Sequence, residues 1–393
     1  MPVSNVLRAV YVHIPFCRAK CAYCDFNSYA GKDGLHEAYV GALCQEAERF
    51  WQECSPATGV ITSVYIGGGT PTILSADQLG RILSASAPAR LRAAECEVTV
   101  EANPGTVDAG SLGALRRRGV NRLSLGVQSL DDNALKLLGR VHDAAEARRV
   151  VALARAAGFD NVNLDFIYGL PWQSLAPDPV GGWRRTLREA ARLDPEHLSL
   201  YALSVEPGTP LHVWVERGEV EVPGEDQVAD MYSLAEDILR EAGYEHYEIS
   251  NWARPGRECR HNLVYWANEP YVGFGAGAHS YVDGRRRSNV AEPAEYVRRV
   301  TERLEVVESD EAIGPDLEMA ETLFLGLRRG LGVSHSEFRR RFGCELADRY
   351  GPTIAELVRS GLLATDADGI RLTPRGRLLG NEVFVRFLPG AGT

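Results

Sequence analysis

The sequence predicts an α/β protein that begins with a partial (β/α)6 barrel, continues into a small α+β region and ends in a winged-helix-like module. Short apolar runs alternate with amphipathic segments from residue 9 to about residue 205, which is typical of parallel strands joined by helices. The alternation stops near residue 215, and three helical segments and a short hairpin pattern close the 393-residue chain. We therefore expect domains at 1–215, 216–310 and 311–393.

Six short runs rich in β-branched or aromatic residues have the character of buried parallel strands. They cover residues 9–14, 63–66, 97–100, 122–127, 162–168 and 197–202. Amphipathic segments separate them at roughly 35–51, 75–87, 108–118, 143–157 and 183–193. Six units are two fewer than a closed eight-fold barrel needs, so an open partial barrel or a doubly wound sheet is expected.

Beyond residue 215 the pattern predicts a helix over 228–241 and a strand over 244–249. A glycine- and aromatic-rich stretch follows at 251–281. Helices are then expected at 317–328, 334–342 and 345–360, with a two-stranded pattern around Gly369. Three helices and a small hairpin are typical of a winged helix, a fold often used to bind DNA, although a fold by itself does not establish function.

The charge balance argues against a nucleic-acid partner. Lys and Arg total 43 against 53 Asp and Glu, a formal net charge of -10, and an acidic surface repels phosphates. No stretch approaches 18 consecutive apolar residues, so no transmembrane segment is expected. Residues 1–10 lack the pattern of a secretory signal, and we expect a soluble protein of the reducing cytoplasm.

Three of the eight cysteines form one compact motif. Cys17, Cys21 and Cys24 are spaced C-x3-C-x2-C, and three thiolates from one loop can hold three corners of a cubane iron–sulfur cluster. The fourth corner would stay open to another ligand. A structural zinc site is the alternative, but it requires four ligands and no nearby CxxC or HxxxH pair completes it.

Further polar and glycine motifs follow the other predicted strands. The run GGGTPT at 67–72 exposes backbone groups to a close ligand, although a tight turn is the alternative. Glu101, Gln128, Arg140 and Asp165 follow the next three strands and offer carboxylates, an amide and a guanidinium. Because sites in such folds lie at the carboxyl ends of the strands, this set suits a nucleoside with an amino-acid tail.

These motifs together resemble a known family. YVHIPFC at 11–17, the cysteine spacing, GGGTPT and NLDFIYGLP at 163–171 are similar to the radical S-adenosylmethionine (SAM) superfamily. Within it, the chain most resembles the oxygen-independent coproporphyrinogen dehydrogenases and their heme-chaperone relatives, the HemW proteins. The resemblance implies that Cys17, Cys21 and Cys24 bind a [4Fe–4S] cluster whose open iron takes SAM. It also implies a SAM site lined by Tyr11, Tyr23, Phe26, Gly68, Gly69, Thr70, Glu101, Gln128, Arg140 and Asp165.

Two features distinguish the relatives. The dehydrogenases carry a fourth cysteine two residues after the third, where this chain has Phe26. Residues 261–266, HNLVYW, resemble the HNxxYW pattern of the heme chaperones, and imidazole and aromatic rings suit heme. The resemblance thus assigns His261, Tyr265 and Trp266 to heme, with Cys259 as another ligand candidate; packing in the core is the alternative.

The resulting interpretation is a heme chaperone that uses a [4Fe–4S] cluster, SAM and heme. Its partners would be a heme-accepting protein and an electron donor for the cluster. Whether SAM is cleaved in turnover, and hence whether the protein is an enzyme, stays open. Oxygen-independent coproporphyrinogen dehydrogenase, acting in porphyrin biosynthesis, is the first alternative. A non-enzymatic iron–sulfur regulatory or binding protein is the second.

Overall fold

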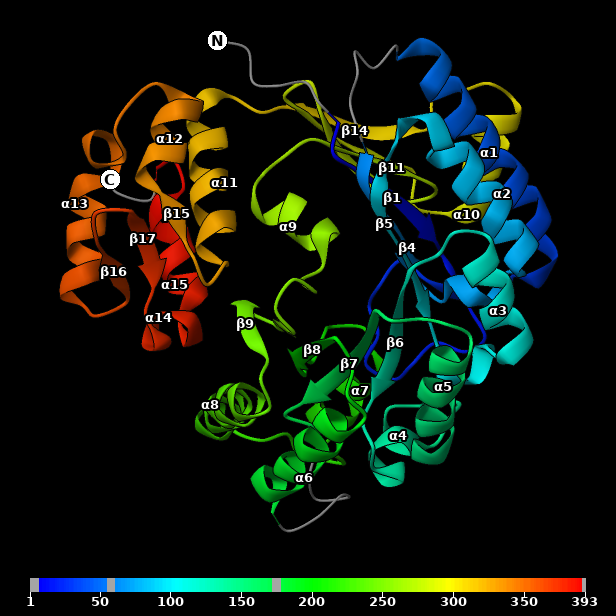
Figure 1. The fold of residues 1–393 in the computed structure, drawn as a ribbon, viewed down its shortest axis with the longest axis horizontal. Helices are drawn as coiled ribbons and strands as arrows, with labels where there is room; N and C mark the ends of the chain where they lie inside the picture. The colour runs from blue at the N-terminus through cyan, green and yellow to red at the C-terminus, as the bar shows by residue number, and fades with distance from the viewer. Residues whose placement is uncertain (1–6, 55–60, 172–177, 391–393) are drawn as a thin grey trace.

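The computed structural model describes residues 7–54, 61–171 and 178–390, and its centre is a large, mainly parallel sheet (Figure 1). Within those residues the sheet has twelve strands in the order β14-β13-β12-β11-β1-β4-β5-β6-β7-β8-β10-β9. The six predicted strands are confirmed as parallel neighbours in sequence order. They are β1 (Ala9–Ile14), β4 (Ile61–Gly68), β5 (Arg92–Ala102), β6 (Arg122–Gln128), β7 (Val162–Tyr168) and β8 (His197–Ala202).

Helices connect these strands and cover the outer face of the sheet (Figure 1). Their N-termini are capped by side chains: Ser75 and Asp108 form capping boxes, and Asp143 accepts from the backbone N–H of Glu146. The apolar stripe predicted in 143–157 is buried as expected. The helices are α1 (His36–Glu53), α2 (Ala76–Ser86), α3 (Ala109–Arg117), α4 (Asp132–Leu137), α5 (Ala144–Ala156) and α6 (Pro179–Arg192).

The next region extends the sheet at both edges. β10 (Asn251–Ala253) pairs antiparallel with β8 and with β9 (Glu245–Glu248), whereas β11 (Tyr271–Phe274) pairs parallel with β1. Val272 and Phe274 are buried in the same apolar core as β1. The stretch 251–281 is therefore partly strand. The remaining elements are α7 (Pro210–Glu216), α8 (Glu225–Glu241), α9 (Arg260–Trp266), β12 (His279–Val282), β13 (Arg285–Asn289), α10 (Pro293–Thr301) and β14 (Val307–Ala312).

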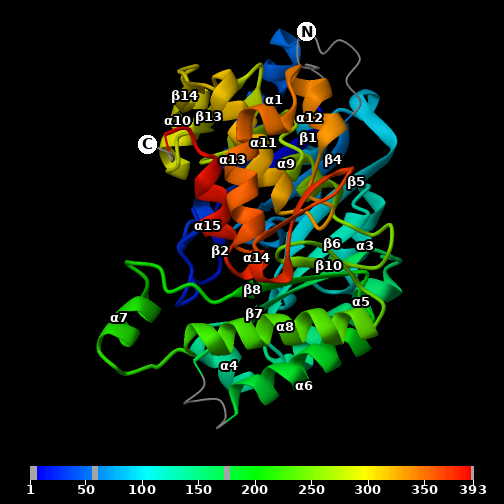
Figure 2. The same ribbon diagram turned by 90° about the vertical axis from the view of Figure 1, so that its left-hand side faces the viewer.

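The C-terminal residues have an apolar core of their own, around Leu323, Phe338, Leu357 and Phe387. The three predicted helices and the hairpin are confirmed, and a third short strand joins the hairpin. This module packs beside α9 (Figures 1 and 2). Its elements are α11 (Pro315–Leu327), β15 (Val333–Ser334), α12 (His335–Phe342), α13 (Leu346–Arg359), β16 (Leu363–Thr365), β17 (Gly369–Leu372), α14 (Pro374–Leu378) and α15 (Gly380–Phe384).

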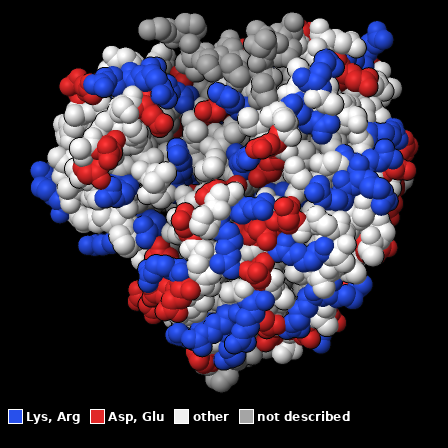
Figure 3. Space-filling view, in the orientation of Figure 1, with Lys and Arg blue, Asp and Glu red and all other residues white. Residues whose placement is uncertain are grey.

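Two surface properties bear on partners. Basic and acidic side chains are intermixed over the face shown in Figure 3. Among the described residues, none of the helices has the length and apolar composition needed to cross a bilayer.

Candidate functional site

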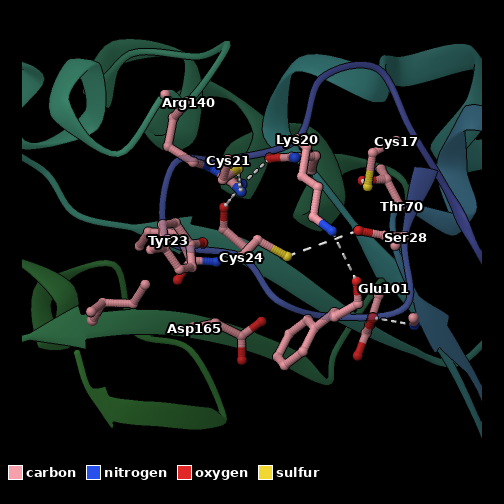
Figure 4. A pocket seen from close by; sticks show the side chains of 18 of the residues that line it. Cys17, Lys20, Cys21, Tyr23, Cys24, Ser28, Thr70, Glu101, Arg140 and Asp165 are labelled. Carbon is pink, nitrogen blue, oxygen red and sulfur yellow. Dashed lines mark hydrogen bonds between the residues drawn. The ribbon is translucent and has the colours of Figure 1, made fainter. Parts of the chain in front are cut away.

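The carboxyl ends of the parallel strands surround a cavity of about 450 Å³, and the cysteine loop forms one of its walls (Figure 4). All three motif cysteines line it, so the structure brings together residues that are distant in sequence. Most of the predicted SAM-site residues line the same cavity. They are Tyr23, Phe26, Gly68, Gly69, Thr70, Glu101, Gln128, Arg140 and Asp165.

Each cysteine sulfur has a polar neighbour. Cys17 Sγ lies 3.6 Å from Thr70 Oγ1, and Cys24 Sγ lies 3.9 Å from Ser28 Oγ. Arg140 Nη1 donates to Cys21 Sγ at 3.4 Å. In the part of the chain that the structure describes, no three His, Cys, Asp or Glu side chains are grouped to bind a single metal ion. Three separated thiols around one cavity fit a multi-iron cluster better than a lone zinc.

The glycine run holds the cysteine loop against the sheet. A Cβ at Gly69 would lie 2.6 Å from Phe16 O and 3.0 Å from Cys17 Sγ. Gly68 has φ +115°, and a Cβ there would lie 2.6 Å from His13 Cε1. Only glycine therefore lets the loop and β4 approach this closely, and the motif is more than a tight turn.

Two carboxyl groups lie on the floor of the cavity. Glu101 accepts from Tyr65 Oη at 2.8 Å and from the Gly68 N–H at 3.0 Å. Burial, and then the charge on Asp165, raise the pKa of Glu101 to about 7. Asp165 accepts from Ser124 Oγ at 3.2 Å and Asn163 Nδ2 at 2.8 Å, and burial raises its pKa as well. Oxygens in this arrangement can accept hydrogen bonds from ribose hydroxyls.

Gln128 and Arg140 are positioned by an irregularity in β6. The register of β6 against β7 shifts between Gly126 and Gln128, and Gln128 has φ 65°. Such bulges and strained residues turn a side chain toward a site. The Arg140 guanidinium donates to Gly126 O at 2.6 Å and to Asn103 Oδ1. Its orientation is thereby fixed beside the cysteine loop.

Tyr11 is the one predicted SAM-site residue that does not line the cavity. Its hydroxyl bonds to His13 Nδ1 at 2.9 Å, and its ring lies beside those of Tyr65 and His261. His13 Nε2 in turn donates to Asn27 O at 2.9 Å, which ties β1 to the end of the cysteine loop.

Several residues that were not predicted from the sequence also line the cavity. Lys20, inside the cysteine motif, donates to Phe26 O at 3.4 Å. Tyr65 and Ser124 lie on predicted strands, and their inward positions could have been found from the alternation of side chains. Tyr201, which follows the same rule, is the penultimate residue of β8. The cavity lining includes Lys20, Tyr65, Ser124 and Tyr201.

The predicted heme segment is a short helix, α9, whose two faces lie in different surroundings. His261 is buried against β4, with Nδ1 3.1 Å from Ser63 Oγ and Nε2 3.0 Å from Tyr265 Oη. Burial lowers the pKa of His261 to about 3. Cys259 is also fully buried, and its thiol donates to Glu97 Oε1 at 3.6 Å. Trp266 lines a separate cleft.

An open parallel sheet that gathers three loop cysteines around a nucleoside-sized cavity is the arrangement of the radical SAM proteins. The profile described as "Radical SAM superfamily" matches residues 11–176, and "HemN C-terminal domain" matches residues 315–379. A solved structure of coproporphyrinogen III oxidase (HemN) from Escherichia coli, described as a radical SAM enzyme, superposes with TM-score 0.82 at 25% identity. It covers 98% of this chain and 90% of that one.

Relatives match over nearly the whole length. Heme chaperone HemW of Bacillus subtilis is 37% identical, covering 97% of this chain and 99% of its own. Heme chaperone HemW of Escherichia coli is 38% identical, covering 97% and 98%. A mitochondrial radical SAM domain-containing protein 1 of Mus musculus is 36% identical, covering 98% and 88%. The chain belongs to the HemW family of the radical SAM superfamily, as the sequence motifs predicted.

Proposed function

We propose that this protein is a heme chaperone that binds a [4Fe–4S] cluster and SAM in the cavity and delivers heme to an acceptor hemoprotein. The full-length similarity to proteins named heme chaperones carries the proposal. Phe26 at the position of the dehydrogenases' fourth cysteine supports it. An electron donor for the cluster is a second protein partner.

In the cavity, Cys17, Cys21 and Cys24 would hold the [4Fe–4S] cluster, and SAM would bind beside it. The cluster would supply electron transfer to SAM, which the surrounding residues position. Glu101 and Asp165 accept hydrogen bonds from the ribose, and Gln128 bonds the nucleoside. Arg140 stays within hydrogen-bond distance of Cys21 Sγ, beside the cluster ligands. The remaining contacts to SAM come from Tyr23, Phe26, Gly68, Gly69 and Thr70, whereas Tyr11 lies outside the cavity lining.

Each of the three regions of the chain has its own part in this proposed function. We propose that the parallel strands form a partial (β/α)6 barrel within 1–215. The extension at 216–310 supplies the segment with His261, Tyr265 and Trp266 for heme. The module at 311–393 is of winged-helix type and, in an acidic chain, serves contacts other than DNA.

A heme titration tests the function. The anaerobically reconstituted protein should bind heme, as followed by the change in heme absorbance, and should pass it to an apo-hemoprotein added in excess. A protein that binds no heme would refute the chaperone function. His261→Ala examines the residue that resemblance assigns as a ligand; unchanged affinity would remove His261 from the heme site.

Oxygen-independent coproporphyrinogen dehydrogenase is a second candidate, favoured by the superposition with coproporphyrinogen III oxidase. Its reaction oxidatively removes two propionate carboxyls as carbon dioxide. Supplying coproporphyrinogen III, SAM and a reductant under anaerobic conditions distinguishes the two functions. Accumulation of protoporphyrinogen over many turnovers would establish the dehydrogenase activity and exclude the chaperone function.

A further inference from the structure

A second cleft, of about 510 Å³, lies on the opposite side of α9 from the barrel interior. Its walls come from α9, from the start of β4, and from α11 and α12 of the C-terminal module. Leu263, Val264, Trp266, Ala267 and Phe338 provide an apolar lining. The volume is within the range of about 300–1,000 Å³ that is usual for sites that bind drug-sized ligands and cofactors.

Helical periodicity divides the HNxxYW pattern between this cleft and the barrel. His261 and Tyr265 are four residues apart, share one face of α9 and bond to each other at 3.0 Å. Trp266 is five residues from His261 and lines the cleft. The Arg328 guanidinium lies over the Trp266 ring at 4.6 Å, and the indole Nε1 is buried without a partner in the structure. The aromatic residue that can pack against a planar macrocycle therefore faces the cleft.

The charges that line the cleft favour an anion. Four arginines and two glutamates line it, although the whole chain is acidic. Arg260 Nη1 donates to a backbone carbonyl, that of Glu95, so its charge is not neutralised. Within the described residues, the guanidinium groups of Arg329 and Arg340 make no hydrogen bond or ion pair. An arginine fork matches a carboxylate geometrically, so these side chains can pair with carboxylates of a ligand.

We propose that heme binds in this cleft, with its ring against Trp266 and Leu263 and its two propionates paired with Arg329 and Arg340. This inference rests on the proposed chaperone function, and it places the heme in the cleft with Trp266 rather than at His261 and Tyr265. No His, Cys, Met or Tyr is among the residues that line the cleft. The iron therefore receives no strong axial ligand from the cleft. Release to an acceptor then requires no iron–protein bond to break.

The experiment compares full-length variants in titrations with heme, with metal-free protoporphyrin IX and with protoporphyrin dimethyl ester. The double variant Arg329→Gln/Arg340→Gln should bind heme and protoporphyrin about a hundredfold more weakly. Each lost charge-assisted hydrogen bond corresponds to roughly tenfold. Arg339→Gln, on the same helix but outside the cleft lining, is the matched control and should bind as wild type does. The dimethyl ester, which lacks the carboxylates, should bind wild type and double variant equally weakly.

Iron contributes little to binding in this arrangement, so the affinity of wild type for metal-free protoporphyrin should be within about threefold of its affinity for heme. An interaction of 1.4 kcal/mol with the iron would instead change the affinity roughly tenfold. The double variant should keep its cluster absorbance and melting temperature, because both substituted side chains make no internal contact that is lost. If wild type binds no heme, the proposed function itself fails. If wild type binds heme and the double variant binds it equally well, or if only His261→Ala loses binding, the cleft is overturned while the chaperone function stands.

Discussion

Replacing Gly68 by alanine should destabilise the protein more than other glycine substitutions with a similar backbone. The added Cβ would lie 2.6 Å from His13 Cε1 and 2.8 Å from His13 Nδ1. The ring cannot easily withdraw, because Tyr11 Oη and Asn27 O hold its two nitrogens at 2.9 Å each. The collision forces either the ring or the cysteine loop to move.

The magnitude follows from two contributions. An alanine at φ +115° costs about 1–2 kcal/mol in backbone strain. Overpacking against a fixed ring costs about 1–3 kcal/mol more. Gly119→Ala is the matched control, because Gly119 has φ +96° but its nearest side-chain atom, Arg92 Nη1, is 3.8 Å away. That variant should lose only the backbone contribution.

Urea unfolding of both cluster-free variants gives the two free energies of unfolding. Iron content after anaerobic reconstitution gives a second readout, because a displaced loop should load less cluster. We expect Gly68→Ala to lose at least about 1 kcal/mol more than Gly119→Ala and to retain less iron. Equal losses in both variants, with equal iron, would refute the steric argument.

Three further predictions concern the cluster, the cavity carboxyl and the C-terminal junction. Alanine at any one of the three loop cysteines should abolish the brown absorbance of the reconstituted protein, while Cys344→Ala should keep it; a brown loop variant would contradict the assignment. Glu101 has its pKa raised from 4.5 to about 7, so its carboxyl ionises more readily in the unfolded chain and wild-type stability falls across that interval. Near neutral pH and above, the free energy of unfolding of Glu101→Gln should therefore exceed that of wild type by about 1–3 kcal/mol, a magnitude reduced to allow for the partial exposure of the side chain. At acidic pH the two proteins should be equally stable. A difference in urea unfolding that does not change with pH would refute this. Arg286→Ala leaves the Glu321 side chain, which is 6% exposed, without its partner and should lower the free energy of unfolding by about 3 kcal/mol in thermal unfolding. Arg285→Ala breaks the more exposed pair with Asp310 and should lower it by less than about 1 kcal/mol. Equal losses would contradict the importance of the buried pair.

The parallel core was readable from the sequence because its signals are local. Each buried strand is a short apolar run, and the residue that follows it is polar, so strand ends and site residues could be found together. The cysteines and the carboxylates Glu101 and Asp165 were predicted as residues that follow strands, and all of them line the cavity. In the structure, however, Glu101 lies within β5 and Asp165 lies within β7 rather than after it. The family followed from the same residues.

Contacts between segments that are distant in the chain could not be predicted from the sequence. β11 was not predicted because Tyr271–Phe274 is short and contains glycine, and only its pairing with β1 stabilises it as a strand. The position of Tyr11 depends on neighbours from β4 and α9, which sequence spacing does not reveal. His261 resembles a ligand by pattern, yet its two nitrogens meet Ser63 and Tyr265.

The helix α9 connects the two sites physically. At its start, Glu97 Oε1 of β5 accepts from the His261 N–H at 3.4 Å. Just beyond its end, Arg341 of the C-terminal module donates to Ala267 O at 3.0 Å and Asn268 O at 2.8 Å. The helix is thus fixed both to the sheet that carries the cavity and to the module that forms the cleft. The Tyr65 ring lies 5.2 Å from that of His261, while its hydroxyl reaches Glu101 in the cavity. The cavity and the cleft therefore share α9 as a common packing partner.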